Sequence, residues 1–333
     1  MPHALKPLKP GIKIAAQVSP EPSDEDVAFI KQMGLEHVVL WTDGRHAGYD
    51  YYASQQALFA DAGLKIYGLG NTDVHNQDAL VLNLPDRDEK IGEYKQHLRA
   101  LGRARIPYTT YAHMANGIWS TESEETRGGA RTRGFNLSKA SEGLWAGKRY
   151  QLPLSHGRRY TEQEIWENYT HFIREVTPVA EQAGVRIGIH PDDPPVAELG
   201  GIPRCIFSSF AGYKRALEIA DSPNIGMCLC VGCWLEGGQH MGLNVVETIR
   251  YFGEQGKLFK VHFRNVHGAL PHFVETFLDS GDTDMYQVMR ALKDVDFRGV
   301  VIADHIPGMV GGPRVGTAFS IAYMKALAER VKE

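Results

Sequence analysis

Four residues in the C-terminal half of the chain have side chains that commonly bind metal ions: His190, Cys230, His262 and Asp304. The intervals between them are 40, 32 and 42 residues, so each follows the last by about one strand-and-helix unit. Two imidazoles, a thiolate and a carboxylate form a donor set compatible with Mn²⁺, Fe²⁺, Co²⁺ or Zn²⁺. Four such ligands leave open positions on an ion of higher coordination number, where substrate oxygens could bind. The types and spacing of these residues therefore predict a catalytic metal site.

Further polar residues lie close to these four in the sequence. His305 directly follows Asp304, and we predict that it is a general acid or base, since an unperturbed imidazole titrates near neutral pH. Arg264 could hold a substrate carboxylate through two parallel hydrogen bonds. Glu275, in the loop that follows, completes the predicted catalytic group. The residues expected to bind substrate are Asp192, Asp193, Asn265, Trp119 and Arg127.

Simpler interpretations exist for several of these residues. The segment His190 to Pro195, two carboxylates held between prolines, could be an acidic surface turn after a strand. The cluster Cys228, Cys230 and Cys233 could form a structural zinc or iron–sulfur site, although no second Cys-x-x-Cys pair accompanies it. The glycine-rich segment 308–312 could cradle a phosphate or be a plain flexible loop.

The metal-ligand candidates lie at the ends of segments that are predicted to be β-strands. Eight such segments are recognisable, at residues 12–18, 37–41, 65–70, 106–113, 185–190, 225–230, 258–265 and 299–305. Helical segments alternate with them, and two of these begin with capping-box patterns at Ser23 and Thr161. Alternating strands and helices imply a parallel sheet, and eight units in one domain predict a (β/α)8 TIM barrel. A doubly wound open sheet is the alternative, but no glycine-rich dinucleotide motif follows the first strand.

Side-chain alternation along the strands supports this placement. Successive side chains of a strand point to opposite faces. In residues 186–190, 225–230 and 260–264 the larger apolar residues alternate with His190, Cys230 and His262. If the apolar set faces the outer helices, these ligand candidates point into the barrel interior. The last strand is apolar on both faces, so its alternation only permits Asp304 to point inward.

Residues 114–160 interrupt the alternation with a segment rich in Gly, Arg and Ser. Loops of this length in compact domains are commonly functional lids or disordered, and Trp119 and Trp145 favour a packed insertion. We therefore expect one domain, residues 1–333, with a long lid-like insertion after the fourth strand.

Composition excludes several classes of protein. The 333 residues are 43% hydrophobic and 23% charged, with a formal net charge of -4, so we expect no nucleic-acid partner. No apolar run is long enough for a membrane helix, and residues 1–10 do not resemble a signal peptide. Four cysteines in a chain of this size favour a reduced, cytoplasmic setting. A homo-oligomer is expected.

Several motifs resemble the mannonate dehydratase family of xylose-isomerase-like barrels. They cover roughly the C-terminal half of the chain and comprise residues 190–195 (HPDDPP), 230–232 (CVG), 262–266 (HFRNV), 281–286 (GDTDMY) and 303–305 (ADH). The resemblance implies that His190, Cys230, His262 and Asp304 hold Mn²⁺ or a similar ion, that His305 is the catalytic acid or base, and that Arg264 contacts the substrate. The reaction it implies is the dehydration of D-mannonate to 2-keto-3-deoxy-D-gluconate.

Two departures from the family pattern concern proton transfer. The family has a tyrosine in a segment after the final strand, whereas the corresponding residues 312–319 here are shorter and contain none. Phe277 stands near the position of a family histidine. These departures keep two alternatives open: a metal-dependent sugar isomerase, epimerase or keto-sugar lyase, and a non-catalytic sugar-binding relative.

Overall fold

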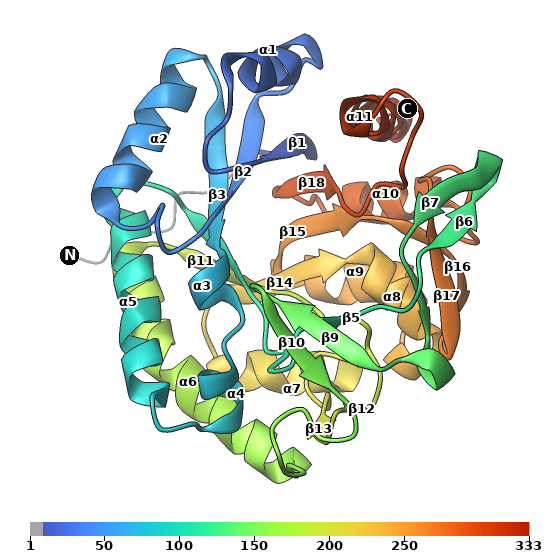
Figure 1. Ribbon diagram of the computed structural model, residues 1–333. Helices are drawn as coiled ribbons and strands as arrows, with labels where there is room; N and C mark the ends of the chain where they lie inside the picture. Colours follow the sequence, from blue (N-terminus) through green and yellow to red (C-terminus); the bar gives the residue numbers. More distant parts are fainter. Residues whose placement is uncertain (1–8, 333) are drawn as a thin grey trace.

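Eight parallel strands form a barrel with helices around it in the computed structural model, which describes residues 9–332 (Figure 1). The strands are β1 (Lys13–Val18), β2 (His37–Thr42), β3 (Lys65–Asn71), β4 (Tyr108–Tyr111), β11 (Arg186–Ile189), β14 (Ile225–Cys230), β15 (Leu258–Phe263) and β18 (Val300–Ala303). Neighbours in space are neighbours in sequence, and β18 pairs with β1. Between β3 and β4 the strands lie side by side without a hydrogen-bonded ladder. The predicted (β/α)8 barrel is confirmed.

One long helix covers the barrel after each strand. These helices are α1 (Asp24–Gln32), α2 (Tyr49–Asp61), α5 (Arg87–Arg103), α6 (Glu162–Ala183), α7 (Phe210–Ala220), α9 (Val245–Glu254), α10 (Met285–Asp294) and α11 (Pro313–Arg330). Both predicted capping boxes are present, at Ser23 for α1 and at Thr161 for α6. Within residues 9–332, no helix combines the length and apolar character needed to cross a bilayer.

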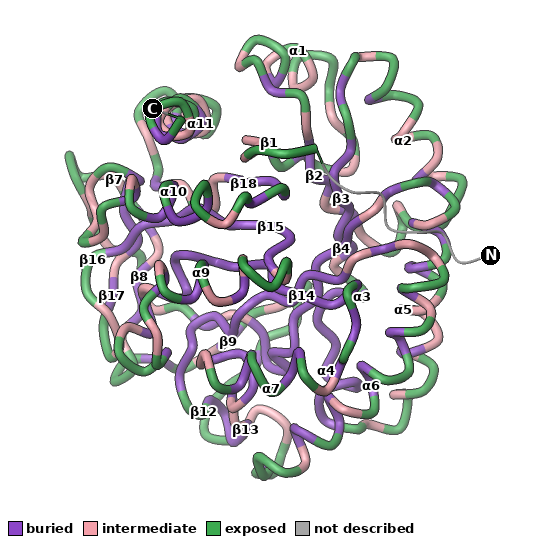
Figure 2. The backbone as a smooth tube through the Cα atoms, turned by 180° about the vertical axis from the view of Figure 1, so that it is seen from behind, coloured by how far each residue is buried: buried purple, intermediate pink, exposed green. Residues whose placement is uncertain are grey.

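The buried apolar side chains form three sets, two of which belong to the barrel, and Figure 2 shows that most barrel strands are largely buried. The larger set fills the layer between strands and helices, and includes Ile187, Leu229 and Val261. A smaller set of seven residues fills the barrel interior, among them Tyr108 and Ile302. Ile302 is on the inner face, so alternation along β18 directs Asp304 inward as well.

Glycines on neighbouring strands make room for the large Tyr108 side chain in the barrel interior. A Cβ atom on Gly68 of β3 would lie 2.4 Å from the Tyr108 ring, and one on Gly188 of β11 would lie 2.4 Å from its hydroxyl oxygen. Real Cβ atoms do not approach other atoms so closely, so both positions require glycine for this ring to fit.

Short elements at the carboxyl end of the barrel were not predicted. They are the helices α3 (Thr72–His75), α4 (Asp78–Leu82) and α8 (Val231–Gly237), the 3-10 turn η3 (Gly238–Met241), and the strands β12 (Glu198–Leu199), β13 (Ile202–Pro203), β16 (Asn265–Ala269) and β17 (His272–Thr276). The helices α3 and α8 follow barrel strands directly and therefore lie at the mouth of the barrel.

The insertion after β4 is built from short antiparallel strands (Figure 1). Its elements are β5 (Ile118–Trp119), β6 (Glu124–Thr126), η1 (Arg127–Gly129), β7 (Ala130–Thr132), β8 (Gly134–Asn136), η2 (Leu137–Lys139), β9 (Glu142–Trp145) and β10 (Lys148–Gln151). Strand β8 pairs with β17 of the β16–β17 hairpin that follows β15, while β9 and β10 form a hairpin that also pairs with β5. The β8–β17 ladder fixes this side of the insertion, through its backbone, to the segment after β15.

Candidate active site

Three metal-ligand candidates converge at the carboxyl end of the barrel. His190 directly follows β11, Cys230 ends β14 and His262 lies near the end of β15, and one donor atom of each lies within 4.8 Å of the others. The Asp304 Oδ2 atom is 3.5 Å from His262 Nδ1 and 3.8 Å from Cys230 Sγ. The structure thus brings together the four side chains that the strand ends indicated.

The donor atoms are in a state suited to binding a cation. His190 Nδ1 is 2.7 Å from the Pro191 carbonyl oxygen, so this nitrogen donates its hydrogen there, and in the neutral ring Nε2 has a free lone pair. Both ring nitrogens of His262 are buried and lack a hydrogen-bond partner among the described residues. Burying such groups is costly unless something binds them, so a divalent ion fits this site.

Electrostatics favour the charged forms of the two acidic donors. Burial alone would raise the pKa of Cys230, but hydrogen bonding with Cys233 and the positive charge of Arg264 hold that pKa well below its usual value. Burial would likewise raise the pKa of Asp304, but His305, His262 and Arg264 lower it further than burial raises it. A thiolate and a carboxylate therefore stand ready as ligands.

Asp193, Cys233 and Glu236 form a second group of possible metal donors, but the Arg264 side chain already binds all three. Arg264 Nη2 lies 3.0 Å from Cys233 Sγ, 3.2 Å from Glu236 Oε1 and 3.3 Å from Asp193 Oδ2. The guanidinium occupies the place that a cation would take. Cys228, Cys230 and Cys233 do not form a joint donor group in the described residues, so the structural-metal interpretation gains no support.

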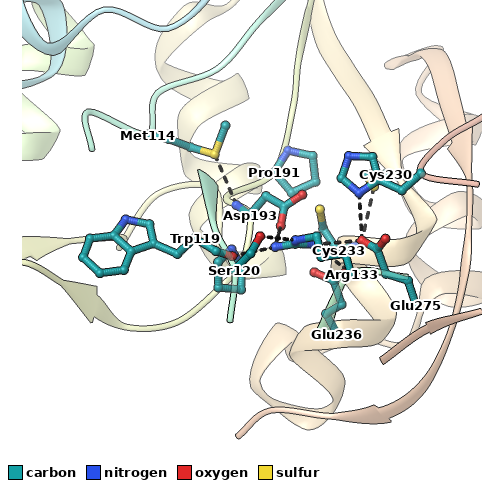
Figure 3. Close-up of polar contacts among 12 residues, drawn as sticks. Met114, Trp119, Ser120, Arg133, Pro191, Asp193, Cys230, Cys233, Glu236 and Glu275 are labelled. Atoms are coloured by element: carbon teal, nitrogen blue, oxygen red, sulfur yellow. Dashed lines mark hydrogen bonds and ion pairs between the residues drawn. The ribbon is translucent and has the colours of Figure 1, made fainter. Parts of the chain in front are cut away.

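The Glu275 carboxylate contacts the Nδ1 atom of the His305 imidazole. Its Oε1 atom lies 2.7 Å from His305 Nδ1, 2.8 Å from Arg264 Nη1 and 2.9 Å from Arg133 Nη1 (Figure 3 shows Glu275 and Arg133). Burial alone would lower the pKa of His305, but the negative charges of Asp304 and Glu275 raise it to about 9. The buried Glu275 carboxylate therefore positions and charges His305 and does not itself face the cavity.

Arg133 joins the insertion to this ion-pair network. Its Nη2 atom is 2.8 Å from the Trp119 carbonyl oxygen and 2.5 Å from Asp193 Oδ1, and its Nε atom is 2.9 Å from Ser120 Oγ (Figure 3). With its bond to Glu275, a single guanidinium thus connects two barrel loops and the insertion. Sequence reasoning noticed this arginine-rich segment but assigned Arg133 no role.

We expect the variant Arg133→Lys to lower kcat by about tenfold or more, with metal content unchanged. Lysine retains the positive charge but cannot bind Asp193, Glu275 and the Trp119 carbonyl oxygen simultaneously, so Glu275 would hold His305 less firmly. Steady-state kinetics and elemental analysis measure both quantities.

The control is Arg131→Lys, an exposed arginine on β7 whose ion pair is with Glu125. Equal kinetic constants for wild type and Arg133→Lys would contradict the role of Arg133 in positioning His305.

A cavity of about 250 Å³ lies over the donor group. The predicted site residues that line it are His190, His262, Asp304, His305 and Asp193. Other lining residues come from the remaining strand ends and from the insertion: Gln17, Trp41, Thr72, His75, Thr110, Met114, Ile118 and Trp145. Met114, Ile118 and Trp145 of the insertion therefore form part of the cavity wall.

Arg264 and Asn265 lie outside this cavity, and their positions correct the interpretation as substrate contacts. The Arg264 side chain is fully buried, and its terminal nitrogens contact carboxylates, two cysteine sulfurs and the His305 ring. The Asn265 amide donates to the carbonyl oxygens of Leu278 and Thr283 at 3.1 and 2.9 Å. Both side chains therefore organise the loops beneath the site.

The structure also does not bring Trp119, Arg127 or Asp192 to the cavity. Trp119 is fully buried within the insertion, where its Nε1 donates to the Asn116 carbonyl oxygen at 3.0 Å. Arg127 forms two hydrogen bonds, of 2.8 and 3.0 Å, with Asp279. Asp192 is buried beside the site, and burial raises its pKa to about 6.

Phe277, near the position of a family histidine, packs against other side chains. Its ring makes an edge contact with Phe319 at 5.9 Å between centroids, and the Arg127 guanidinium lies 5.0 Å above it. It contributes no proton-transfer group.

His75 and Trp41 are among the cavity residues that sequence reasoning missed, and Trp145 was given only a packing role. Trp41 lies in β2, and His75 follows the end of β3 by four residues. Extending the strand-end criterion to the first four strands would have found Trp41, whereas His75 lies in the short helix α3. Trp145 could not be found in this way, because only the folded hairpin brings it to the cavity.

Fold and site together define a TIM-barrel protein with a candidate metal centre at the carboxyl ends of its strands. The fold is similar to that of a xylose isomerase domain protein from Planctomyces limnophilus, with a TM-score of 0.63 at 13% identity, over 97% of this chain and 99% of that one. It is more similar to the structure of mannonate dehydratase from Streptococcus suis serotype 2, with a TM-score of 0.84 at 24% identity, over 97% and 94% of the two chains.

Residues 28–333 match the family model described as D-mannonate dehydratase (UxuA), and the chain belongs to this family. Mannonate dehydratase of Thermotoga neapolitana is 31% identical over 271 residues, which is 73% of each chain. Mannonate dehydratase 2 of Halalkalibacterium halodurans is 28% identical over 300 residues, 81% of this chain and 83% of that one. The resemblance seen in the motifs is confirmed.

Proposed function

We propose that this protein is a metal-dependent hydro-lyase that converts D-mannonate into 2-keto-3-deoxy-D-gluconate and water. The observation that carries the proposal is the convergence of His190, Cys230, His262 and Asp304 beside His305 at the carboxyl end of the barrel, where all of them except Cys230 line one cavity. Membership of the D-mannonate dehydratase family supports both the reaction and the substrate.

His190, Cys230, His262 and Asp304 would hold the divalent ion, for which Mn²⁺ is our first choice and Fe²⁺, Co²⁺ and Zn²⁺ are the alternatives. Bound there, a divalent ion supplies Lewis acidity that stabilises negative charge on substrate oxygens when a proton is removed beside the carboxylate. The mixed donor set supports a metal of intermediate softness and does not by itself select one.

His305 is the group that we assign to proton transfer. Its Nδ1 atom is held by Glu275, so Nε2 remains for the substrate, and the carboxylate stabilises the protonated ring. In the proposed reaction the proton on C2 passes through a base to solvent, and protonated His305 gives its proton to the departing C3 hydroxyl, which leaves as water. The resulting enol becomes the 2-keto acid by taking up a proton at C3 and releasing the proton of its hydroxyl, and His305 is protonated again from solvent.

We also propose a cytoplasmic location and a homo-oligomeric state. The four cysteines are free, which agrees with a reducing compartment. Light scattering on the purified protein measures the oligomeric state.

Product analysis tests the proposed reaction. Purified protein incubated with Mn²⁺ and D-mannonate should produce a 2-keto-3-deoxy acid, whose new methylene group at C3 is visible by proton NMR, and chelated protein should produce none. An interconverted sugar acid would instead indicate an isomerase or epimerase. Tight binding without turnover of any sugar acid would indicate the non-catalytic relative.

A further inference from the structure

The cavity has an aromatic wall formed by Trp41, His75 and Trp145, residues distinct from the four donors. The His75 ring makes an edge contact with Trp41, with 4.8 Å between centroids, and lies against the Trp145 ring at 5.2 Å and 37°. Trp41 and His75 come from the β2 and β3 side of the barrel, and Trp145 comes from the insertion. Flat aromatic surfaces of this kind pack against the C–H faces of sugars and polyols.

His75 offers this wall a neutral hydrogen-bond acceptor. Burial lowers the pKa of His75 to about 3, so the ring is uncharged near neutral pH. Its Nδ1 atom is 3.0 Å from the Thr110 carbonyl oxygen and must carry the hydrogen, since a carbonyl oxygen only accepts. Nε2 is then an acceptor, and it has no hydrogen-bond partner within residues 9–332.

Trp145 offers a hydrogen-bond donor. Its Nε1 atom is buried and lacks a partner among the described residues. The β9–β10 hairpin that carries it turns at Ala146 and Gly147, both with positive φ. Asp78 of α4 fixes the hairpin by accepting hydrogen bonds from Tyr150 at 2.8 Å and Lys148 at 3.1 Å. Trp145 is therefore held in place with an unused N–H group.

Trp145 also separates the cavity from a larger groove. This outer groove, of about 730 Å³, lies between the β9–β10 hairpin, α3 and α5, and it shares only Trp145 and Thr72 with the inner cavity (Figure 1 shows these elements). The indole ring thus lies between the inner cavity and the outer groove. Removing it would connect the two spaces.

We propose that His75 and Trp145 form a subsite for the distal hydroxyl groups of a sugar acid, and that Trp145 limits the length of the chain that fits. Nε2 of His75 accepts from one hydroxyl, Nε1 of Trp145 donates to another, and the rings cover the carbon chain. The identity of the ligand as a hexonate rests on the proposed function, whereas the subsite itself rests on the residues described here.

The test measures binding separately from turnover. In the His305→Asn background, calorimetry with D-mannonate on Mn²⁺-loaded protein should give a Kd about tenfold higher after Trp145→Ala and an intermediate Kd after Trp145→Phe, which keeps the ring but loses the N–H. Leu144→Ala is the matched control, because Leu144 is the exposed neighbour of Trp145 on β9.

The limit on length is tested with melibionate, an aldonate that carries a galactosyl unit on its terminal oxygen. Trp145→Ala should bind melibionate more tightly than the parent does, although it binds D-mannonate more weakly. An unchanged Kd for D-mannonate would overturn the subsite, and an unchanged or weaker Kd for melibionate would overturn the limit on length. If the wild-type protein binds D-mannonate but does not dehydrate it, the proposed reaction fails and the binding comparison still stands.

Discussion

Replacement of His305 by asparagine is expected to lower kcat by about 10²–10⁴-fold, the usual contribution of a general acid or base, while the bound metal is retained. The substitution should add little backbone strain. His305 has a φ of 45°, and asparagine is among the non-glycine residues that adopt this left-handed region most readily. Asparagine cannot exchange a proton with substrate, so turnover should fall without unfolding. Kinetics, elemental analysis and thermal unfolding give the three readouts.

His267→Asn serves as the control, because His267 is exposed on β16 and pairs with Asp282. If His305→Asn lost metal and activity together, His305 would be a ligand, and the proton-transfer role would have to be reassigned.

Removal of one metal ligand should lower turnover by as much, because the protein would bind its metal ion more weakly. We expect His190→Ala to bind Mn²⁺ at least 100-fold more weakly and to lose turnover at metal concentrations that saturate the wild type. Changing even a residue that only hydrogen-bonds to a metal ligand commonly lowers metal affinity or activity by about 10–100-fold. His190 Nε2 is the nitrogen left available by a ring whose Nδ1 is fixed by the Pro191 carbonyl oxygen. Titration of chelated protein by calorimetry measures the affinity.

The exposed His240 on η3 provides the matched control, His240→Ala. Metal affinity that is the same in His190→Ala and wild type would show that the ion binds elsewhere.

Local signals in the sequence predicted the barrel and the donor group. Each barrel strand is a short apolar run bounded by turn residues, and Ile225–Cys230 has the same bounds in prediction and structure. Alternation placed Cys230 and His262 on the inner face, and both lie there because one-residue alternation is a property of every strand. Strand ends converge in any barrel, so the site could be located before its distances were known.

Contacts between segments distant in sequence could not be predicted in the same way. Arg264 follows a strand end and was expected to face substrate, but Glu236 and Glu275 hold it beneath the cavity. The ion pairs of Arg133 and Arg264 with buried carboxylates leave no periodic pattern in the sequence. The pairing of β8 with β17 leaves none either. Arg133 and Trp145 acquire their roles only when the insertion folds onto the barrel.

The most direct test of the account is a metal titration followed by product formation. Chelated protein supplied with D-mannonate should be inactive, and the rate of 2-keto-3-deoxy-D-gluconate formation should rise with added Mn²⁺ and level off at one ion per chain. Undiminished dehydration by the metal-free protein, or one ion bound without any dehydration of D-mannonate, would contradict the claim that these four strand-end residues form the catalytic metal centre of a mannonate dehydratase.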